Sequence, residues 1–253
     1  MQTPNLTSPA QAMVLAAGRG ERMRPLTDTT PKPLLSVQGK PLIQWTLEGL
    51  ARAGVRQSLV NTAWLGEQLP QQLGDELQVP TAAGPVPLHI AYSHEGRDFG
   101  GALETAGGIA RALPRLAPVF WIAAGDVFAP DFGFDADALE RFSASDRLAH
   151  VWLVPNPAHN PKGDFGLLPD GTALAHPPAN GPGFTYSTIG LFRAELFQAP
   201  WCDIPHGNPE GIRLGLAPVL RAAMAAGRVS AQHYAGRWTD VGTPQRLAAL
   251  NGP

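Results

Sequence analysis

The sequence is poor in cysteine, in excess charge and in long apolar runs. Its 253 residues include one cysteine, which cannot form an internal disulfide, so we expect a protein of the cytoplasm. The net charge of −2 argues against nucleic acid or a membrane surface as a partner. The longest apolar run, residues 119–124, is far shorter than the roughly 20 residues that span a bilayer.

Glycine and proline, in contrast, are abundant. The chain has 28 glycines and 26 prolines, and hydrophobic residues make up 44% of it. The hydrophobic content is sufficient for a large core and excludes wholesale disorder. We therefore expect many tight loops on a compact scaffold.

Apolar runs that read as strands alternate with helical patterns over the first 150 residues. We expect strands at 12–17, 55–61, 88–93 and 119–124, and helices at 42–53, 65–77, 105–113 and 136–145. This alternation predicts an α/β fold with a Rossmann-like, mostly parallel sheet.

Beyond residue 150 the links become rich in turns. Short strands are expected at 151–154, 165–168, 185–192, 229–234 and 238–242, with a helix at 215–226. We expect a tail at 1–11 and one domain at 12–250. Its 12–150 half would bind the nucleotide, and its 151–250 half would carry a small β-rich lid over the acceptor side.

A glycine-rich loop, residues 15–25, follows the first expected strand. Gly18 and Gly20 lack Cβ atoms, so backbone N–H groups can converge there on an anion. The loop also has three guanidinium groups suited to phosphate oxygens, on Arg19, Arg22 and Arg24.

Several kinds of glycine-rich loop have sequences that resemble this pattern in part. A dinucleotide fingerprint requires a third glycine where Met23 stands, and an acidic residue near the end of the second strand, where Asn61 and Thr62 stand. A Walker loop requires Gly-Lys-Ser/Thr, which is absent. An ordinary glycine-rich turn remains open, but the arginines favour a triphosphate-binding loop of another type.

Lysine is scarce, with three residues against sixteen arginines. A bias toward arginine explains the ratio, yet Lys32 persists between Pro31 and Pro33. The prolines favour an extended, stiff backbone. A compact ammonium beside a phosphate is a role that the planar guanidinium does not reproduce.

These motifs together resemble the signature of the sugar-1-phosphate nucleotidyltransferases. They are Leu15-Ala-Ala-Gly-x-Gly-x-Arg-Met-x-Pro25, Pro31-Lys-Pro-Leu34 and Gly39-Lys-Pro-Leu-Ile43, and the similarity extends from about residue 12 to residue 250. The resemblance implies the nucleotide-diphospho-sugar transferase fold, a mixed sheet flanked by helices. It also implies two small-molecule substrates, a nucleoside triphosphate and a sugar 1-phosphate.

A second set of motifs narrows the resemblance. It includes Asn61-Thr-Ala-Trp-Leu-Gly66, Glu104-Thr-Ala-Gly-Gly-Ile109 and Trp238-Thr-Asp-Val-Gly-Thr243. These segments are similar to the branch of the family that joins UTP to N-acetylmuramate α-1-phosphate in the recycling of cell-wall sugars.

Two aspartates are candidates for a metal site. Asp126 follows a buried run and Gly125, and Asp240 lies at the end of another short strand. Two carboxylates together with substrate phosphates suit Mg²⁺, which retains several waters. The resemblance assigns the metal to the same pair, and the catalytic roles to Arg22, Lys32 and Asp126.

The resemblance also implies the remaining binding residues. The nucleotide would contact Ala16, Ala17, Gly18, Arg19, Gly20, Lys32, Glu95, Thr105, Gly107 and Gly125. We expect Thr105 to cap a helix and Gly107 to let a ring approach closely, unless the glycines only tighten the helix start. The sugar phosphate would contact Asn156, Asp164, Ser187 and Trp238. The seven histidines show no metal-ligand spacing, so surface or structural roles are expected for them.

Alternatives within the same chemistry are a mannose-1-phosphate guanylyltransferase and a glucose-1-phosphate uridylyl- or thymidylyltransferase. An alternative of another class is a non-catalytic nucleotide-sugar-binding regulatory subunit. Such a subunit would be expected to lose Arg22, Lys32, Asp126 or Asp240, and all four are present. Oligomeric state is left open.

Overall fold

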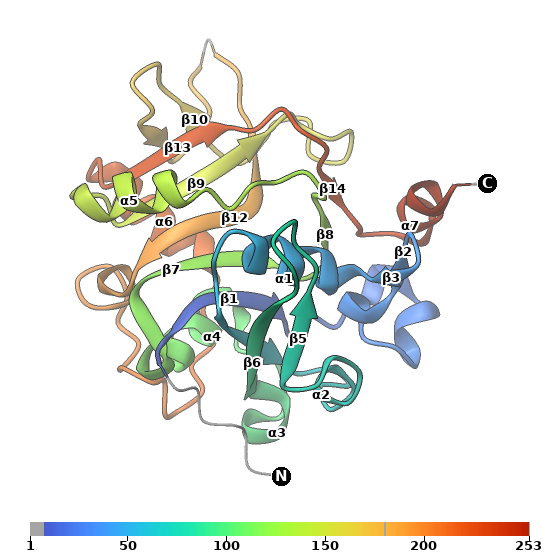
Figure 1. The fold of residues 1–253 in the computed structure, drawn as a ribbon. Helices are drawn as coiled ribbons and strands as arrows, with labels where there is room; N and C mark the ends of the chain where they lie inside the picture. Colours follow the sequence, from blue (N-terminus) through green and yellow to red (C-terminus); the bar gives the residue numbers. More distant parts are fainter. Residues whose placement is uncertain (1–7, 180, 253) are drawn as a thin grey trace.

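An eight-stranded sheet forms the centre of the fold (Figure 1). The structure is a computed structural model and describes residues 8–179 and 181–252. The strand order of the sheet is β13-β9-β12-β7-β1-β4-β6-β5. Within this sheet only β12 and β5 run against the other strands. The strands are β1 (Ala10–Ala16), β4 (Gln57–Thr62), β5 (Glu76–Val79), β6 (Val86–His94), β7 (Leu116–Ala124), β9 (Ala149–Val154), β12 (Thr185–Arg193) and β13 (Val229–His233).

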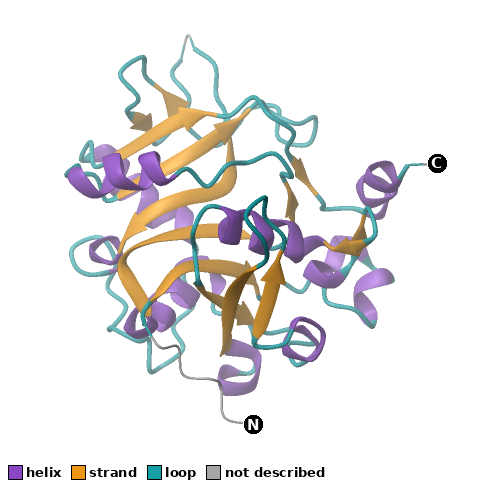
Figure 2. Ribbon diagram, in the orientation of Figure 1, coloured by secondary structure: helices purple, strands orange, loops and turns teal. Residues whose placement is uncertain are grey.

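Helices cover both faces of the sheet (Figure 2). Helices α1 (Leu42–Arg52) and α5 (Ala136–Ala144) pack on one face, and α4 (Glu104–Ala112) and α6 (Leu216–Ala225) on the other. Successive residues of a strand point to opposite faces. Accordingly, Met13 belongs to the core beneath α4 and α6, whereas Val14 belongs to the core beneath α1. Three shorter helices are α2 (Gln68–Leu73), α3 (Glu95–Phe99) and α7 (Pro244–Asn251).

Three pairs of two-residue strands lie outside the main sheet. They are β2 (Ser36–Val37) with β3 (Lys40–Pro41), β8 (Val127–Phe128) with β14 (Thr239–Asp240), and β10 (Gly166–Leu167) with β11 (Ala173–Leu174). Single 3-10 turns occur at Glu21–Met23, Leu26–Asp28, Lys32–Leu34, Leu113–Arg115 and Ala194–Phe197. The β8–β14 pair matters most for the site, because it joins a segment from the middle of the chain to one near its carboxyl end.

The predicted α/β class, a mixed sheet with flanking helices, is confirmed, with two differences of detail. The helix expected at 65–77 is shorter, because it ends before Gly74, whose φ is positive (+69°), and edge strand β5 begins soon afterwards. The strands expected in a separate lid are β9, β12 and β13, which extend the main sheet. The β10–β11 hairpin is the part that stands apart from it.

The expected tail lies mostly outside the described residues, which begin at residue 8, and β1 already starts at Ala10. None of the helices in the described part of the chain combines the length and the apolar character that crossing a bilayer requires.

Candidate functional site

A cavity of about 660 Å³ opens at the carboxyl ends of β1, β4 and β7. Open α/β sheets bind ligands in the crevice at this edge of their parallel strands. Most of the nucleotide-side residues expected from the sequence line it: Ala16, Ala17, Gly18, Arg19, Gly20, Arg22, Lys32, Glu95, Thr105 and Asp126. The fold therefore brings the glycine-rich loop, the lysine and one aspartate into one hollow.

The glycine-rich loop bends tightly over Lys32. Gly20 has a left-handed backbone (φ +65°), and a Cβ on it would lie 3.1 Å from the Cβ of Lys32. The hydroxyl of Thr27 donates to the carbonyl of Gly20 at 2.8 Å and closes the bend. Glycine adopts this conformation without steric cost. At Gly18 nothing lies within 4 Å of a built Cβ, so this side of the loop is open.

The three arginines of the loop have different surroundings. Arg19 and Arg24 both pair with Asp28, at 3.0 and 2.8 Å, and hydrogen bonding to Arg19 holds the pKa of Asp28 below its usual range. Arg19 also stacks on Trp64, with its guanidinium carbon 3.8 Å from the ring centroid. Arg22 is exposed, lines the cavity and has no hydrogen bond or ion pair within the described residues. Of the three, Arg22 is the one available to a ligand.

Lys32 faces two carboxylates. Its Nζ lies 2.6 Å from Oδ2 of Asp126 and 3.8 Å from Oδ1 of Asp240. The backbone differs in part from the expected extended segment: Pro31 is extended, but residues 32–34 form a 3-10 turn. This turn is closed by the amide of Leu35, which donates to the carbonyl of Lys32, and it buries the lysine stem.

The pairing of β8 with β14 brings Asp126 and Asp240 together. Asp126 directly precedes β8, and Asp240 pairs with Val127 of that strand. The amide of Val241 also donates to the carbonyl of Asp126 at 3.3 Å. A short two-stranded ladder thus connects two aspartates that are far apart in the sequence.

The donor set fits a magnesium ion held jointly with a substrate. Both carboxylates face the same buried ammonium, and carboxylate oxygens are ligands that Mg²⁺ prefers. Within residues 8–179 and 181–252, no group of three or more His, Cys, Asp and Glu side chains is placed to hold a metal ion. A divalent ion beside Asp126 and Asp240 would therefore need oxygens from bound phosphates as well.

Two residues near Asp240 did not stand out in the sequence. Arg246 donates through Nη1 to Oδ2 of Asp240 at 2.8 Å, and Nε2 of His159 lies 3.3 Å from the same oxygen. The Thr243-Pro244 pair was a usable signal for Arg246, since it marks a helix start. Thr243 indeed caps α7 and places Arg246 in its first turn. For His159 the expectation of a surface or structural role overlooked its contact with the candidate metal ligand.

A buried polar relay forms part of the cavity wall. The amide of Ala16 donates to Oδ1 of Asn61 at 2.8 Å, and Nδ2 of Asn61 donates to Oε1 of Glu95 at 2.7 Å. Oε2 of Glu95 accepts from the amide of Leu103 at 2.8 Å. Glu95 is fully buried, and burial raises its pKa. The relay joins the ends of β1 and β4 to the segment before α4, so Glu95 supports the cavity wall.

Three nucleotide-side expectations need correction. Thr105 lines the cavity but does not cap α4, which begins at Glu104 after Leu103. Gly107 is buried, and a Cβ on it would lie 2.4 Å from the carbonyl of Ile212, so it accommodates a neighbouring loop rather than a ring. Gly125 packs against Ile43 and is likewise not among the residues that line the cavity.

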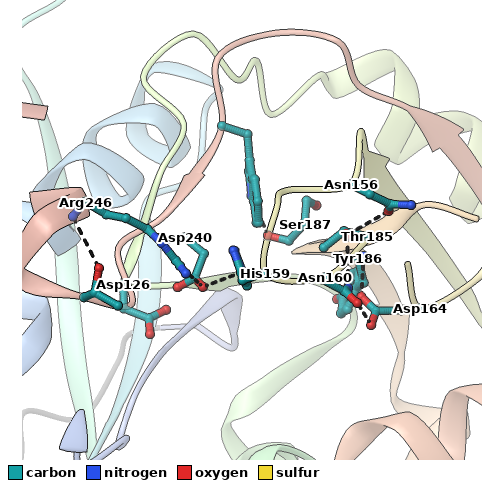
Figure 3. Close-up of polar contacts among 12 residues, drawn as sticks. Asp126, Asn156, His159, Asn160, Asp164, Thr185, Tyr186, Ser187, Asp240 and Arg246 are labelled. Carbon is teal, nitrogen blue, oxygen red and sulfur yellow. Dashed lines mark hydrogen bonds and ion pairs between the residues drawn. The ribbon is translucent and has the colours of Figure 1, made fainter. Parts of the chain in front are cut away.

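On the acceptor side, the polar side chains bind their own loop and the segment that leads into β12 (Figure 3). Nδ2 of Asn156 donates to the carbonyl of Gly183 at 2.9 Å. The carboxylate of Asp164 accepts from Nδ2 of Asn160 at 3.1 Å and from the amide of Tyr186 at 2.9 Å. We call residues 155–164 the acceptor loop. Asn156 and Asp164 shape this loop, instead of projecting freely toward a sugar.

Because of a bulge in β12, Thr188 lines the cavity instead of the expected Ser187. Ser187 is fully buried, and its hydroxyl accepts from the amide of Ile189 at 3.1 Å. The register of β12 against β9 shifts between Tyr186 and Gly190, and Thr188 (φ +63°) lines the cavity. Bulges re-aim side chains in this way. Nε1 of Trp238 donates to the carbonyl of Ser187 at 3.0 Å and holds the turn.

Comparison with known proteins agrees with this geometry. The family model described as "Nucleotidyl transferase" matches residues 11–175. The chain is 50% identical over 240 residues to the N-acetylmuramate alpha-1-phosphate uridylyltransferase of Neisseria meningitidis, covering 94% of this chain and 95% of that one. It is 31% identical to the enzyme of the same name from Caulobacter vibrioides, covering 96% of each.

The architecture is also that of a solved structure. A crystal structure from Bacillus anthracis, of a suggested glucose-1-phosphate thymidylyltransferase, superposes with a TM-score of 0.73 at 20% identity. The match covers 95% of this chain and 94% of that one. It supports the fold.

Proposed function

The chain belongs to the nucleotidyl transferase family, and we propose that it joins UTP to N-acetylmuramate α-1-phosphate. The products would be UDP-N-acetylmuramate and pyrophosphate. The observation that carries this proposal is the 50% identity, over nearly the whole of both chains, to the uridylyltransferase of Neisseria meningitidis. The convergence of Lys32, Asp126 and Asp240 supports an active enzyme over a non-catalytic subunit.

In the proposed reaction an oxygen of the sugar phosphate attacks the α-phosphorus of UTP. A P–O bond forms there, the bond to the bridging oxygen of the β-phosphate breaks, and pyrophosphate leaves with that oxygen. The attacking phosphate is already anionic, so no side chain has to remove a proton. Positioning and neutralisation of charge carry most of the catalysis in phosphoryl chemistry.

The residues of this chain divide these tasks. The open amides at Gly18 and the unpaired guanidinium of Arg22 would bind the β- and γ-phosphates. Lys32 would stabilise the charge that develops at the α-phosphate, because its ammonium is held at the inner wall of the cavity. The buried relay of Asn61 and Glu95 would orient the end of β1, where the nucleoside would lie.

Magnesium is part of the proposal. Asp126 and Asp240 would hold it together with the phosphates, and when bound it neutralises phosphate charge. We also propose that the reaction takes place in the cytoplasm, where UTP is available, and that it returns a cell-wall sugar to the nucleotide-sugar pool.

A screen of pyrophosphate release tests the proposal. UTP, dTTP, GTP, CTP and ATP would each be offered with N-acetylmuramate, mannose and glucose 1-phosphates in the presence of Mg²⁺. We expect the highest kcat/KM for UTP with N-acetylmuramate α-1-phosphate. Turnover of GTP with mannose 1-phosphate and none with the expected pair would replace the substrate assignment. A lack of turnover with every pair would favour the regulatory subunit.

A further inference from the structure

The two carboxylate oxygens of Asp240 have different surroundings. Oδ2 accepts a hydrogen bond from Nη1 of Arg246 at 2.8 Å, and Nε2 of His159 lies 3.3 Å away from it (Figure 3). Oδ1 accepts no hydrogen bond from any described residue and faces Nζ of Lys32 at 3.8 Å. One oxygen is therefore engaged from outside the cavity, and the other faces the position where a cation is expected.

Arg246 is held firmly on its side of Asp240. Thr243 accepts from the amide of Arg246 at the start of α7, and Nη1 of Arg246 also donates to the backbone carbonyl of Asp240 at 3.0 Å. Binding both the backbone and the side chain of one residue restricts the rotation of that carboxylate. This helix lies near the carboxyl end of the chain.

His159 approaches from the opposite side, on the acceptor loop. The loop folds on itself: the amide of Asn160 donates to the carbonyl of Pro157 at 2.9 Å, and the amide of Gly163 to that of Asn160 at 3.1 Å. Gly163 has φ +72°, and a Cβ on it would lie 2.6 Å from the amide nitrogen of Phe184. The loop is thus pinned against the start of β12, which leaves His159 beside Asp240 with a side chain 34% exposed.

We propose that His159 is a positioning residue for the cation site, acting through Asp240. Together with Arg246 it fixes Oδ2, so that Oδ1 is presented to the divalent ion that accompanies UTP. Partners of this kind orient carboxylate ligands of metals, and their loss typically costs about 10- to 100-fold in metal affinity or activity. Because His159 belongs to the acceptor loop, seating of that loop and completion of the cation site are coupled. The inference rests on the proposed binding of a metal–nucleotide complex.

The test is the affinity of Mn²⁺ for the enzyme in the presence of UTP, measured by electron paramagnetic resonance without any sugar phosphate. His159→Ala is expected to weaken Mn²⁺ binding by about 10- to 100-fold. His159→Gln should recover much of the loss, because its amide can donate from a similar position. The matched control is His206→Ala, since His206 is exposed and has no hydrogen bond within the described residues.

Wild-type affinity in His159→Ala would overturn the inference. A second arm uses Asp240→Asn, in which adding His159→Ala should cause no further loss if His159 acts through Asp240. An additive loss in this background would also overturn it. The Mn²⁺ measurement contains no sugar phosphate. If the enzyme failed to turn over N-acetylmuramate α-1-phosphate in the pyrophosphate-release screen, that result would therefore count only against the proposed function. A wild-type protein that binds no Mn²⁺ with UTP would overturn both.

Discussion

Lys32 and Asp126 form an ion pair in which the cation is buried and the anion is not. The side chain of Lys32 is 8% exposed and that of Asp126 is 37% exposed, with 2.6 Å between Nζ and Oδ2. Removal of Lys32 would leave a carboxylate that water can still solvate. Removal of Asp126 would leave a buried ammonium with Asp240 at 3.8 Å as its nearest carboxylate. The two halves of the pair are therefore not equivalent for folding.

The first prediction concerns Lys32→Met. We expect turnover to fall by on the order of 10²- to 10³-fold, the usual cost of removing one charge-stabilising group from a reaction centre. The free energy of unfolding should change little, because Asp126 remains solvated and methionine fills the space of the lysine stem. Pyrophosphate-release kinetics and urea denaturation measure the two quantities.

Lys40→Met is the contrasting variant. Nζ of Lys40 lies 2.5 Å from the carboxylate of Glu48, whose side chain is 9% exposed, and 3.6 Å from the ring centroid of Trp45. Its loss should reduce stability and leave turnover per folded molecule near the wild-type value. If Lys32→Met lowered stability as much as Lys40→Met while retaining turnover, Lys32 would be structural.

The second prediction separates two arginines of the glycine-rich loop. Arg22 has no partner within the described residues, whereas Arg24 pairs with Asp28 outside the cavity. We expect Arg22→Ala to raise the KM for UTP and lower kcat, and Arg24→Ala to leave both nearly unchanged. Equal effects of the two variants would indicate that the loop acts through its general positive charge. Initial rates over a range of UTP concentrations at fixed sugar phosphate decide between these outcomes.

Much of this site was predictable because its local signals are strong. The buried strand before Gly18 and the cluster of arginines predict an anion-binding loop at a sheet edge, and the loop lies there. Asp126 lies two residues beyond the end of a second buried strand, so its position at the same edge also follows from the pattern. Local sequence suffices where a strand end determines the location of a side chain.

The remaining features depend on long-range contacts that no local pattern contains. Asp240 meets Lys32 and Asp126 only because β14 pairs with β8, and His159 meets Asp240 only because the acceptor loop closes against β12. The exchange of Ser187 for Thr188 at the cavity arises from a bulge whose register depends on neighbouring strands. The hydrogen bonds that join Asn156 and Asp164 to the segment at Gly183 and Tyr186 likewise required the folded chain.

The third prediction concerns His150 and acid stability. His150 lies on β9, with Nδ1 2.9 Å from the hydroxyl of Ser230, and burial lowers its pKa from 6.5 to about 4. The unfolded chain therefore takes up a proton near pH 6.5, whereas the folded protein does so only near pH 4. Stability should thus rise with pH between these values and be lost as pH falls from 6.5 to 4, by at most about 3 kcal/mol.

Urea denaturation at a series of pH values measures this contribution. His150→Gln should show a smaller loss between pH 6.5 and 4, and His206→Ala should follow the wild-type curve, because His206 is exposed. Parallel curves for the wild type and His150→Gln would mean that other groups cause the acid sensitivity.

The last prediction concerns Gly108→Ala. Helix propensity favours alanine at this position, whereas packing disfavours it, so the two effects on stability have opposite signs. In the interior of a helix, alanine is normally more favourable than glycine by about 0.5–1 kcal/mol. Gly108 lies within α4, but a Cβ there would be 2.5 Å from Oε1 of Glu95 and 3.2 Å from Nδ2 of Asn61. Glu95 is fully buried and cannot move away freely, so the methyl group should break the relay that holds the amide of Ala16.

We therefore expect Gly108→Ala to destabilise the protein by about 1–3 kcal/mol, as overpacking does, and to raise the KM for UTP. Gly133→Ala is the control, because nothing lies within 4 Å of a Cβ built on Gly133. Differential scanning calorimetry and UTP titration kinetics measure both effects. A higher melting temperature for Gly108→Ala would mean that helix propensity outweighs the contact and that the cavity wall tolerates movement of Glu95.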